Sequence, residues 1–303
     1  MTSRNGRVVL LSNPVAGSGD AALHAARAVA RLHQLGLEVE HIAGVSRAHA
    51  LELATTAVAT RPEAFLVAGG DGGVSVAVQA LAGTDVPLGI IPTGTGNDTA
   101  RTLGIPLDDV TRAADVAAAG RSRVFDLGHV TLADGTERYF IGVVGADYAS
   151  DVLALSHRLP WPVPDSGRFL ASTLLASWRL RAHRFSILTG DGRDLSGKYH
   201  IAAVGNLRAY GGGMTICPGA DAHDGLLDLT LMRRTALPHV RLAPYLRQAY
   251  TGGVVPDETV EFHRAASFTL SAPGRELFAD GDPVGPLPAE IRSVPGALRV
   301  IVP

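Results

Sequence analysis

The stretch AFLVAGGDGGV, residues 64–74, decides the fold. Its first part, Ala64–Ala68, is apolar and predicts a buried strand. A loop of four glycines and one aspartate follows, and a helical run begins at Val74; the loop residues are Gly69, Gly70, Asp71, Gly72 and Gly73. So many glycines cost more backbone entropy than a simple turn needs, and they let phosphate oxygens approach the main chain. The stretch therefore predicts a strand, a phosphate-binding loop and a helix.

Asp71 is the unexpected residue of this loop. A carboxylate beside bound phosphates repels them unless a cation lies between the two, and Mg²⁺ is the cation that suits both. A structural alternative stays open, in which Asp71 is an N-cap residue in a glycine-rich turn.

On both sides of this stretch, short strand-like runs alternate with alanine-rich helical runs. The predicted strands are 7–12, 37–42, 64–68 and 87–91, and the predicted helices are 20–35, 49–60 and 74–81. This order predicts a mostly parallel sheet with helices on both faces. Ligands bind at the carboxyl ends of the strands in such sheets.

Two further glycine-rich loops follow strands of this sheet. One is NPVAGSG, 13–19, whose candidate residues are Asn13, Pro14 and Gly17. By itself it is also compatible with a connecting turn. The other is PTGTGND, 92–98, and its candidate residues are Gly94, Thr95, Gly96, Asn97 and Asp98. Backbone N–H groups in such loops bind anions, so the three loops together predict a phosphate site at one edge of the sheet.

After Arg121 the pattern changes to strands joined by tight turns, such as Asp134-Gly135 between the runs 124–132 and 136–144. This half predicts an antiparallel β-sandwich, interrupted by helical runs at 167–182 and 237–250. A last strand is predicted at 297–302. The expected domains are 1–123, completed by 291–303, and 124–290.

Composition excludes several classes of protein. Lys198 is the only lysine, so the chain has neither the lysine of a nucleotide-binding P-loop nor that of a protein kinase. A net charge of −2 argues against nucleic acid as a partner and favours a small-molecule or lipid substrate. The single cysteine, Cys217, cannot form an internal disulfide bond. The sequence predicts neither a signal peptide at the amino terminus nor a segment of transmembrane length. We therefore expect a cytoplasmic protein.

These motifs resemble those of the soluble bacterial diacylglycerol kinases and the related sphingosine and ceramide kinases. The family pattern contains N-P-x-x-G, G-G-D-G-T and P-x-G-T-x-N-D, which match the three loops described above. The resemblance continues through the second half, at Gly205-Asn206, 210–214, 218–228 and 280–282. NAD kinases and phosphofructokinases share only the G-G-D-G element.

The resemblance implies an α/β domain of the NAD kinase and phosphofructokinase type, a β-sandwich domain, and an active site in the cleft between them. ATP would lie on the three loops. By the same resemblance, Asp71, Asp98 and Asp126 hold the catalytic Mg²⁺, partly through water. A second, structural Mg²⁺ would be held by Asp221, Asp224 and the Leu226 carbonyl group, although Asp-x-x-Asp-Gly is also a common turn.

The catalytic base of the family is the glutamate of D-G-E, and here that position is Asp282. Aspartate is shorter by one methylene group, and an exposed Asp-Gly turn is the alternative interpretation. Two more positions depart from the family pattern. Gly73 replaces a threonine, and the region around Gly44 lacks an ATP-contacting threonine. Each change removes one hydrogen bond, of order 1 kcal/mol.

The sequence thus predicts an ATP-dependent lipid kinase that phosphorylates a lipid hydroxyl group, with diacylglycerol as the expected acceptor. It would act in the cytoplasm, at the inner face of the membrane. The run 167–182 is either a lipid-contacting lip or an amphipathic helix packed on the sandwich. A non-catalytic nucleotide-binding or lipid-binding protein of the same fold, and an NAD kinase, are the alternatives. Relatives form dimers, which leaves a homodimer open.

Overall fold

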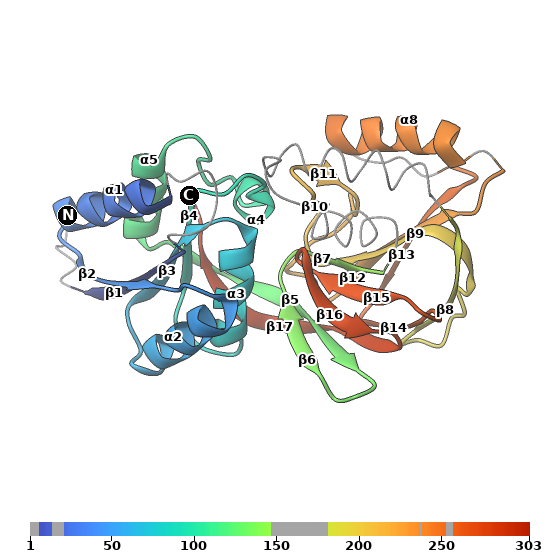
Figure 1. Ribbon diagram of the computed structural model, residues 1–303, viewed down its shortest axis with the longest axis horizontal. Coiled ribbons are helices and arrows are strands. Elements are labelled where there is room, and N and C mark those ends of the chain that lie inside the picture. Colours follow the sequence, from blue (N-terminus) through green and yellow to red (C-terminus); the bar gives the residue numbers. More distant parts are fainter. Residues whose placement is uncertain (1–5, 14–20, 147–180, 237, 253–256) are drawn as a thin grey trace. The chain divides into compact units, whose positions relative to one another are not determined.

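The computed structural model describes residues 6–13, 21–146, 181–236, 238–252 and 257–303 (Figure 1). The chain divides into two compact units, Met1–Leu127 with Pro295–Pro303, and Gly128–Val294. Strands β5 (Ser122–Leu132) and β17 (Ala289–Ile301) each contain one of the boundaries between the units. Two strands therefore carry the chain from one unit to the other. The predicted helix 167–182 lies almost entirely outside the described residues.

The first unit is a parallel sheet with the strand order β17-β4-β3-β1-β2. Its elements are β1 (Arg7–Ser12), α1 (Ala21–Gln34), β2 (Glu38–Ala43), α2 (Arg47–Ala59), β3 (Ala64–Gly69), α3 (Asp71–Leu81), β4 (Leu88–Pro92), α4 (Asp98–Thr102) and α5 (Val110–Ala119). Figure 1 shows α1 and α5 on one face of the sheet and α2 and α3 on the other. Because helices cover both faces, β3 and β4 are buried along almost their whole length. The predicted α/β architecture is confirmed.

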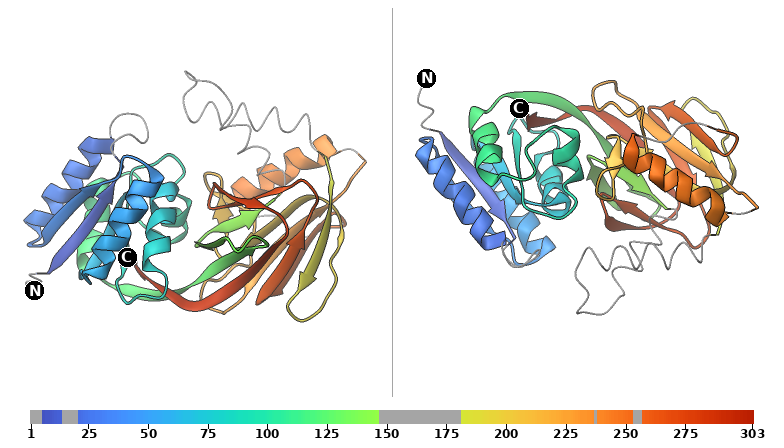
Figure 2. Two further views of the ribbon diagram at one scale, coloured as in Figure 1. Left: turned by 60° about the horizontal axis from the view of Figure 1, so that its bottom comes forward. Right: turned by 90° about the horizontal axis from the view of Figure 1, so that it is seen from above.

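The second unit is an antiparallel β-sandwich, as predicted. Besides parts of β5 and β17 it contains β6 (Glu137–Phe140), β7 (Val143–Gly145), β8 (His183–Thr189), β9 (Gly197–Gly205), β10 (Ala209–Tyr210), β11 (Met214–Thr215), β12 (Leu227–Arg233), α8 (Pro238–Thr251), β13 (Val260–Ala265), β14 (Ser267–Ser271), β15 (Glu276–Ala279) and β16 (Asp282–Pro286). Strand β9 pairs with β7, β8 and β12. Alternate residues along the strands of this unit face a core that includes Phe140, Phe185, Leu229 and Phe268. Figure 2 shows these strands from two further directions.

Three sets of predicted bounds need correction. Helix α3 begins at Asp71 and not at Val74, so the aspartate and two glycines form its first turn. The predicted strand 136–144 is split into β6 and β7, because the backbone N–H groups between them bond to the side chain of Asp280 instead of to a strand. The last strand begins at Ala289, well before the predicted residue 297.

Helix α5 was not predicted. It begins after Asp109, whose carboxylate accepts hydrogen bonds from the N–H groups of Thr111 and Arg112. It ends at Gly120, which has a left-handed backbone with φ 62°.

Candidate functional site

The second and third glycine-rich loops lie in contact at the carboxyl ends of β3 and β4. The Thr93 N–H group donates a hydrogen bond of 3.1 Å to the Gly69 carbonyl group. A Cβ atom built on Gly94 would lie 2.5 Å from the Cα atom of Gly70. The main chains of the two loops therefore meet at a distance that only glycine permits.

Asp71 links the same two loops through its carboxylate. Its Oδ2 atom accepts a hydrogen bond of 3.0 Å from Asp98 N, and its Oδ1 atom accepts one of 3.1 Å from Thr99 N. Both donors belong to the first turn of α4, whose free N–H groups attract negative charge. Asp71 does not cap its own helix, since Gly70 is the N-cap residue of α3. Its carboxylate is thus fixed by the neighbouring helix.

The carboxylates of Asp71 and Asp98 face a common point beside Gly96. A Cβ atom built on Gly96 would lie 3.0 Å from Asp71 Oδ2 and 3.7 Å from Asp98 Oδ2. Mg²⁺ is commonly held by one or two carboxylates together with substrate phosphates and water. A carboxylate oxygen that accepts one N–H bond keeps a further lone pair for a metal ion. This pair of residues therefore fits a nucleotide-associated Mg²⁺.

Asn97 shapes the third loop with its side-chain amide. Its Oδ1 atom accepts a hydrogen bond of 3.1 Å from Gly94 N, and its Nδ2 atom donates one of 2.6 Å to Gly94 O. The residue is buried and has a left-handed backbone, φ 52°, which asparagine tolerates better than most residues. Both ends of the amide are used inside the loop, whereas Thr95 is exposed at its tip. Asn97 holds the loop in shape.

Gly73 lies in the first turn of α3, where its N–H group bonds to the Gly70 carbonyl group at 3.0 Å. A Cβ atom at Gly73 would lie 3.0 Å from Cγ1 of Val67, whereas one at Gly72 would meet nothing within 4 Å. The threonine of the family pattern would therefore crowd Val67 in this chain. The packing against β3 gives a physical reason for glycine at this position.

The structure brings together only some of the residues predicted to bind nucleotide and metal. Asp126 is buried in β5, and its Oδ1 atom accepts a hydrogen bond of 2.8 Å from Gly296 N. No group of three or more His, Cys, Asp or Glu residues in the described part of the chain is arranged to hold a metal ion, so Asp126 does not join Asp71 and Asp98 in one such group. Asn13 is exposed at the end of β1. Pro14 and Gly17 lie outside the described residues.

In the second unit, Asp280 and Gly281 form the two-residue turn between β15 and β16. Both have left-handed backbones, φ 49° and 86°, as a type I′ turn requires. The Asp280 carboxylate accepts hydrogen bonds of 3.0 and 2.9 Å from Ile141 N and Gly142 N. Asp280 thereby anchors the turn.

Asp282 follows this turn as the first residue of β16 and forms an ion pair with Arg138 of β6. Arg138 Nη2 lies 3.0 Å from Asp282 Oδ2, and Arg138 Nη1 donates a bond of 3.2 Å to the Pro283 carbonyl group. The Asp282 side chain keeps 24% of its surface exposed. Sequence reasoning missed Arg138, because its partner lies 144 residues away.

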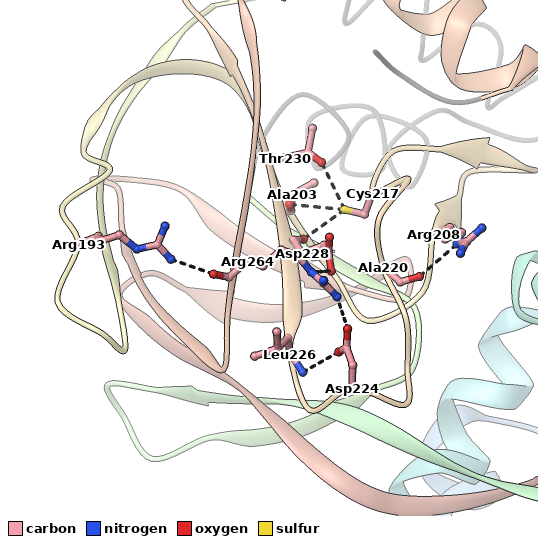
Figure 3. A network of polar contacts seen from close by, with 10 residues as sticks. All are labelled: Arg193, Ala203, Arg208, Cys217, Ala220, Asp224, Leu226, Asp228, Thr230 and Arg264. Carbon is pink, nitrogen blue, oxygen red and sulfur yellow. Dashed lines mark hydrogen bonds and ion pairs between the residues drawn. The ribbon is translucent and has the colours of Figure 1, made fainter. Parts of the chain in front are cut away.

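The residues predicted to hold a second Mg²⁺ have a different arrangement (Figure 3). Asp221 is exposed, and Asp224 Oδ1 accepts a hydrogen bond of 2.9 Å from Leu226 N. Asp224 Oδ2 forms an ion pair with Arg264 of β13, a residue that sequence reasoning did not single out. As arranged here, these oxygen ligands do not fit a divalent cation, because the Arg264 guanidinium group already bonds to the Asp224 carboxylate.

The contact between the two loops gives a testable prediction. The variant Gly94→Ala is expected to lower the free energy of unfolding by about 1–3 kcal/mol, because the new methyl group overlaps the main chain at Gly70. The matched variant Gly72→Ala places a methyl group in open space within a helix, and it should leave stability unchanged or raise it. Urea unfolding followed by circular dichroism measures both. Equal stability of the two variants would contradict the close approach.

The regions that match known protein families together cover nearly the whole chain. The family described as "Diacylglycerol kinase catalytic domain" matches residues 7–130, and "YegS C-terminal NAD kinase beta sandwich-like domain" matches 142–302. A "Diacylglycerol kinase" of Mycobacterium tuberculosis is 40% identical over 301 residues, which cover 98% of this chain and 96% of that one. A "Probable lipid kinase YegS-like" protein of Pseudomonas fluorescens is 31% identical and covers 84% of this chain and 82% of its own.

The fold also has a solved counterpart. The crystal structure of a diacylglycerol kinase from Bacillus anthracis superposes with a TM-score of 0.74, at 20% identity, and covers 100% of this chain and 98% of that one. Among the residues that the structure describes, no helix is both long and apolar enough to cross a membrane.

Proposed function

Because the chain belongs to the diacylglycerol kinase catalytic domain family of lipid kinases, we propose that it transfers the γ-phosphate of ATP to the hydroxyl group of diacylglycerol. The observation that carries this proposal is the joining of two glycine-rich loops by the Asp71 carboxylate, with Asp98 beside it. Backbone N–H groups of these loops and of the first turn of α3 suit phosphate oxygens. The first unit would therefore bind the nucleotide.

In this proposal, Asp71 and Asp98 hold Mg²⁺ at the nucleotide phosphates. Phosphate transfer needs mainly positioning and charge neutralisation, which two carboxylates, a metal ion and backbone donors supply without a lysine. When bound, Mg²⁺ supplies positive charge to the phosphate oxygens. Asp71 is suited to this task because the first turn of α4 fixes its orientation.

We assign Asp282 the role of base toward the lipid hydroxyl group. The hydroxyl oxygen forms a bond to the γ-phosphorus, the bond from this phosphorus to the β–γ bridging oxygen breaks, and ADP leaves. The hydroxyl proton passes to the Asp282 carboxylate. Arg138 is the positioning residue, because its ion pair with Asp282 orients a side chain shorter than the glutamate of the family pattern.

The experiment that tests the proposal follows labelled phosphate from γ-labelled ATP, with Mg²⁺, into a panel of acceptors. The panel contains micellar diacylglycerol, a sphingoid base, a ceramide, a prenol and NAD. Label in phosphatidic acid alone is the expected result. Label in another lipid would support a lipid kinase with a different acceptor, and label in NAD would favour the NAD kinase alternative. ATP binding without any labelled product would favour a non-catalytic binding protein.

The same proposal gives the protein a place of action. Diacylglycerol resides in membranes, so the chain would act at the inner membrane face as a peripheral protein. Co-sedimentation with diacylglycerol-containing vesicles measures this association, and recovery of all protein in the supernatant would contradict it.

A further inference from the structure

The segment 217–228 of the sandwich, a loop together with the first two residues of β12 and called the loop 217–228 below, is held by two arginines that come from outside it (Figure 3). Arg264, on β13, bonds to Asp224 and donates a hydrogen bond of 3.1 Å from Nε to Asp228 Oδ2. Arg208, which precedes β10, donates a bond of 3.2 Å from Nε to the Ala220 carbonyl group. Figure 3 shows the Arg264 guanidinium group directed between the two carboxylates.

Asp228 is the buried member of this set, and only 6% of its surface is exposed. Burial raises the pKa of its carboxyl group, and the charge and hydrogen bond of Arg264 oppose that effect. A buried carboxylate without a nearby cation is costly, so some positive charge has to accompany it. Arg264 supplies this charge from the residue directly opposite, since Asp228 and Arg264 are register partners on β12 and β13.

The backbone around the arginine is fixed as well. The Arg264 carbonyl group accepts a hydrogen bond of 2.9 Å from Arg193 Nη2. At the start of the loop, the buried Cys217 thiol contacts Thr230 Oγ1 at 3.5 Å and the Asp228 carbonyl group at 3.4 Å. The backbone that carries Arg264 and the start of the loop are therefore both held in place, while 44% of the Arg264 side-chain surface stays exposed.

We propose that the Arg264 guanidinium group is the resident cation of the loop 217–228 and takes the place in which the family resemblance predicts a structural Mg²⁺. One fixed side chain bonds to both Asp224 and Asp228, and a guanidinium group with several N–H donors is suited to bridge two carboxylates. The loop then keeps its conformation in the absence of divalent ions. This inference concerns the sandwich and does not depend on the proposed kinase activity.

The test is hydrogen–deuterium exchange of the full chain, read by mass spectrometry on peptides that cover 217–228. It is measured in excess EDTA and again in millimolar Mg²⁺. Because the readout is local, Mg²⁺ bound in the first unit does not confuse it. In the wild-type protein we expect the same exchange rate under both conditions. Slower exchange of this loop in Mg²⁺ would overturn the proposal.

Variants of Arg264 make the test complete. In EDTA, Arg264→Gln is expected to speed exchange of the loop about tenfold or more, because two carboxylates lose their cation. Arg264→Lys keeps a positive charge and should stay closer to the wild-type rate. Unchanged exchange in Arg264→Gln would contradict the proposal. If this variant does not fold, the wild-type comparison decides the question alone.

The matched control is Arg233→Gln. Arg233 forms an ion pair with Glu261, and these residues lie on the same strands, β12 and β13, outside the loop. Its replacement removes one arginine–carboxylate pair and should leave exchange of the loop 217–228 unchanged. An equal effect of Arg233→Gln and Arg264→Gln would mean that strand stability in general, and not the cation at the loop, controls exchange, and it would overturn the proposal.

Discussion

Replacement of Asp71 by asparagine is expected to lower the rate of phosphate transfer from ATP at least about 10³-fold. The variant removes the negative charge that would hold Mg²⁺ beside Asp98. It also places an amide N–H group against one of the two backbone N–H groups of α4 that now bond to the carboxylate, at Asp98 N and Thr99 N. We therefore expect a loss of stability of about 1 kcal/mol as well. Initial rates with saturating ATP and lipid measure the first effect, and urea unfolding measures the second.

A matched control is Asp109→Asn. Asp109 caps α5 in the same unit, and a single oxygen, Oδ1, accepts both hydrogen bonds from Thr111 N and Arg112 N. Asparagine keeps that oxygen and is an equally good N-cap residue, so both activity and stability should remain near the wild-type values. If Asp71→Asn retained wild-type turnover at limiting Mg²⁺, the metal-binding role of Asp71 would be wrong.

Replacement of Asp282 by alanine is the second change with a large expected effect. We expect turnover to fall about 10²-fold or more while ATP binding stays unchanged, because the proposed base acts on the acceptor and not on the nucleotide. Asp282→Glu restores the family residue and should retain activity. Single-turnover phosphate transfer and equilibrium binding of ATP measure the two properties separately.

The controls for Asp282 are two other aspartates of Asp-Gly turns. Asp134→Ala alters the exposed turn between β5 and β6, where the carboxylate bonds to Thr136 N at 2.9 Å, and turnover should not change. Asp280→Ala removes the carboxylate that holds Ile141 N and Gly142 N, so this variant should lose stability. Wild-type turnover by a folded Asp282→Ala protein would refute the assignment of the base.

Local sequence signals were sufficient for much of the fold. The apolar run before the glycines predicted β3, and alternation of strands and helices predicted the α/β unit, because these features depend on neighbours within a few residues. The start of α3 was predicted too far along the chain, because glycine has a low helix propensity. In the structure the first turn of α3 begins at Asp71 and contains two glycines. The split between β6 and β7 depends on Asp280, which lies far along the chain.

Long-range partners limited the prediction of the site. The three loops and their acidic residues were visible as motifs, and the structure brings Asp71 and Asp98 together. The arginines that bond to Asp282 and Asp224 were not identified, because they lie 144 and 40 residues away from them and no spacing rule connects such pairs. Asp224 was assigned to a metal ion from a local sequence motif. This motif is the same whether or not an arginine of β13 lies beside Asp224.

The course of β17 has a consequence for synthesis of the chain on the ribosome. Its end pairs with β4, where Val300 is in register with Leu88, and completes the sheet of the first unit. Residues 295–303 are translated only after the whole second unit. Until then the nascent first unit presents β4 as an open sheet edge, a common point of aggregation. The second unit can therefore begin to fold before the first unit is complete. A nascent chain arrested before residue 295 should depend on chaperones.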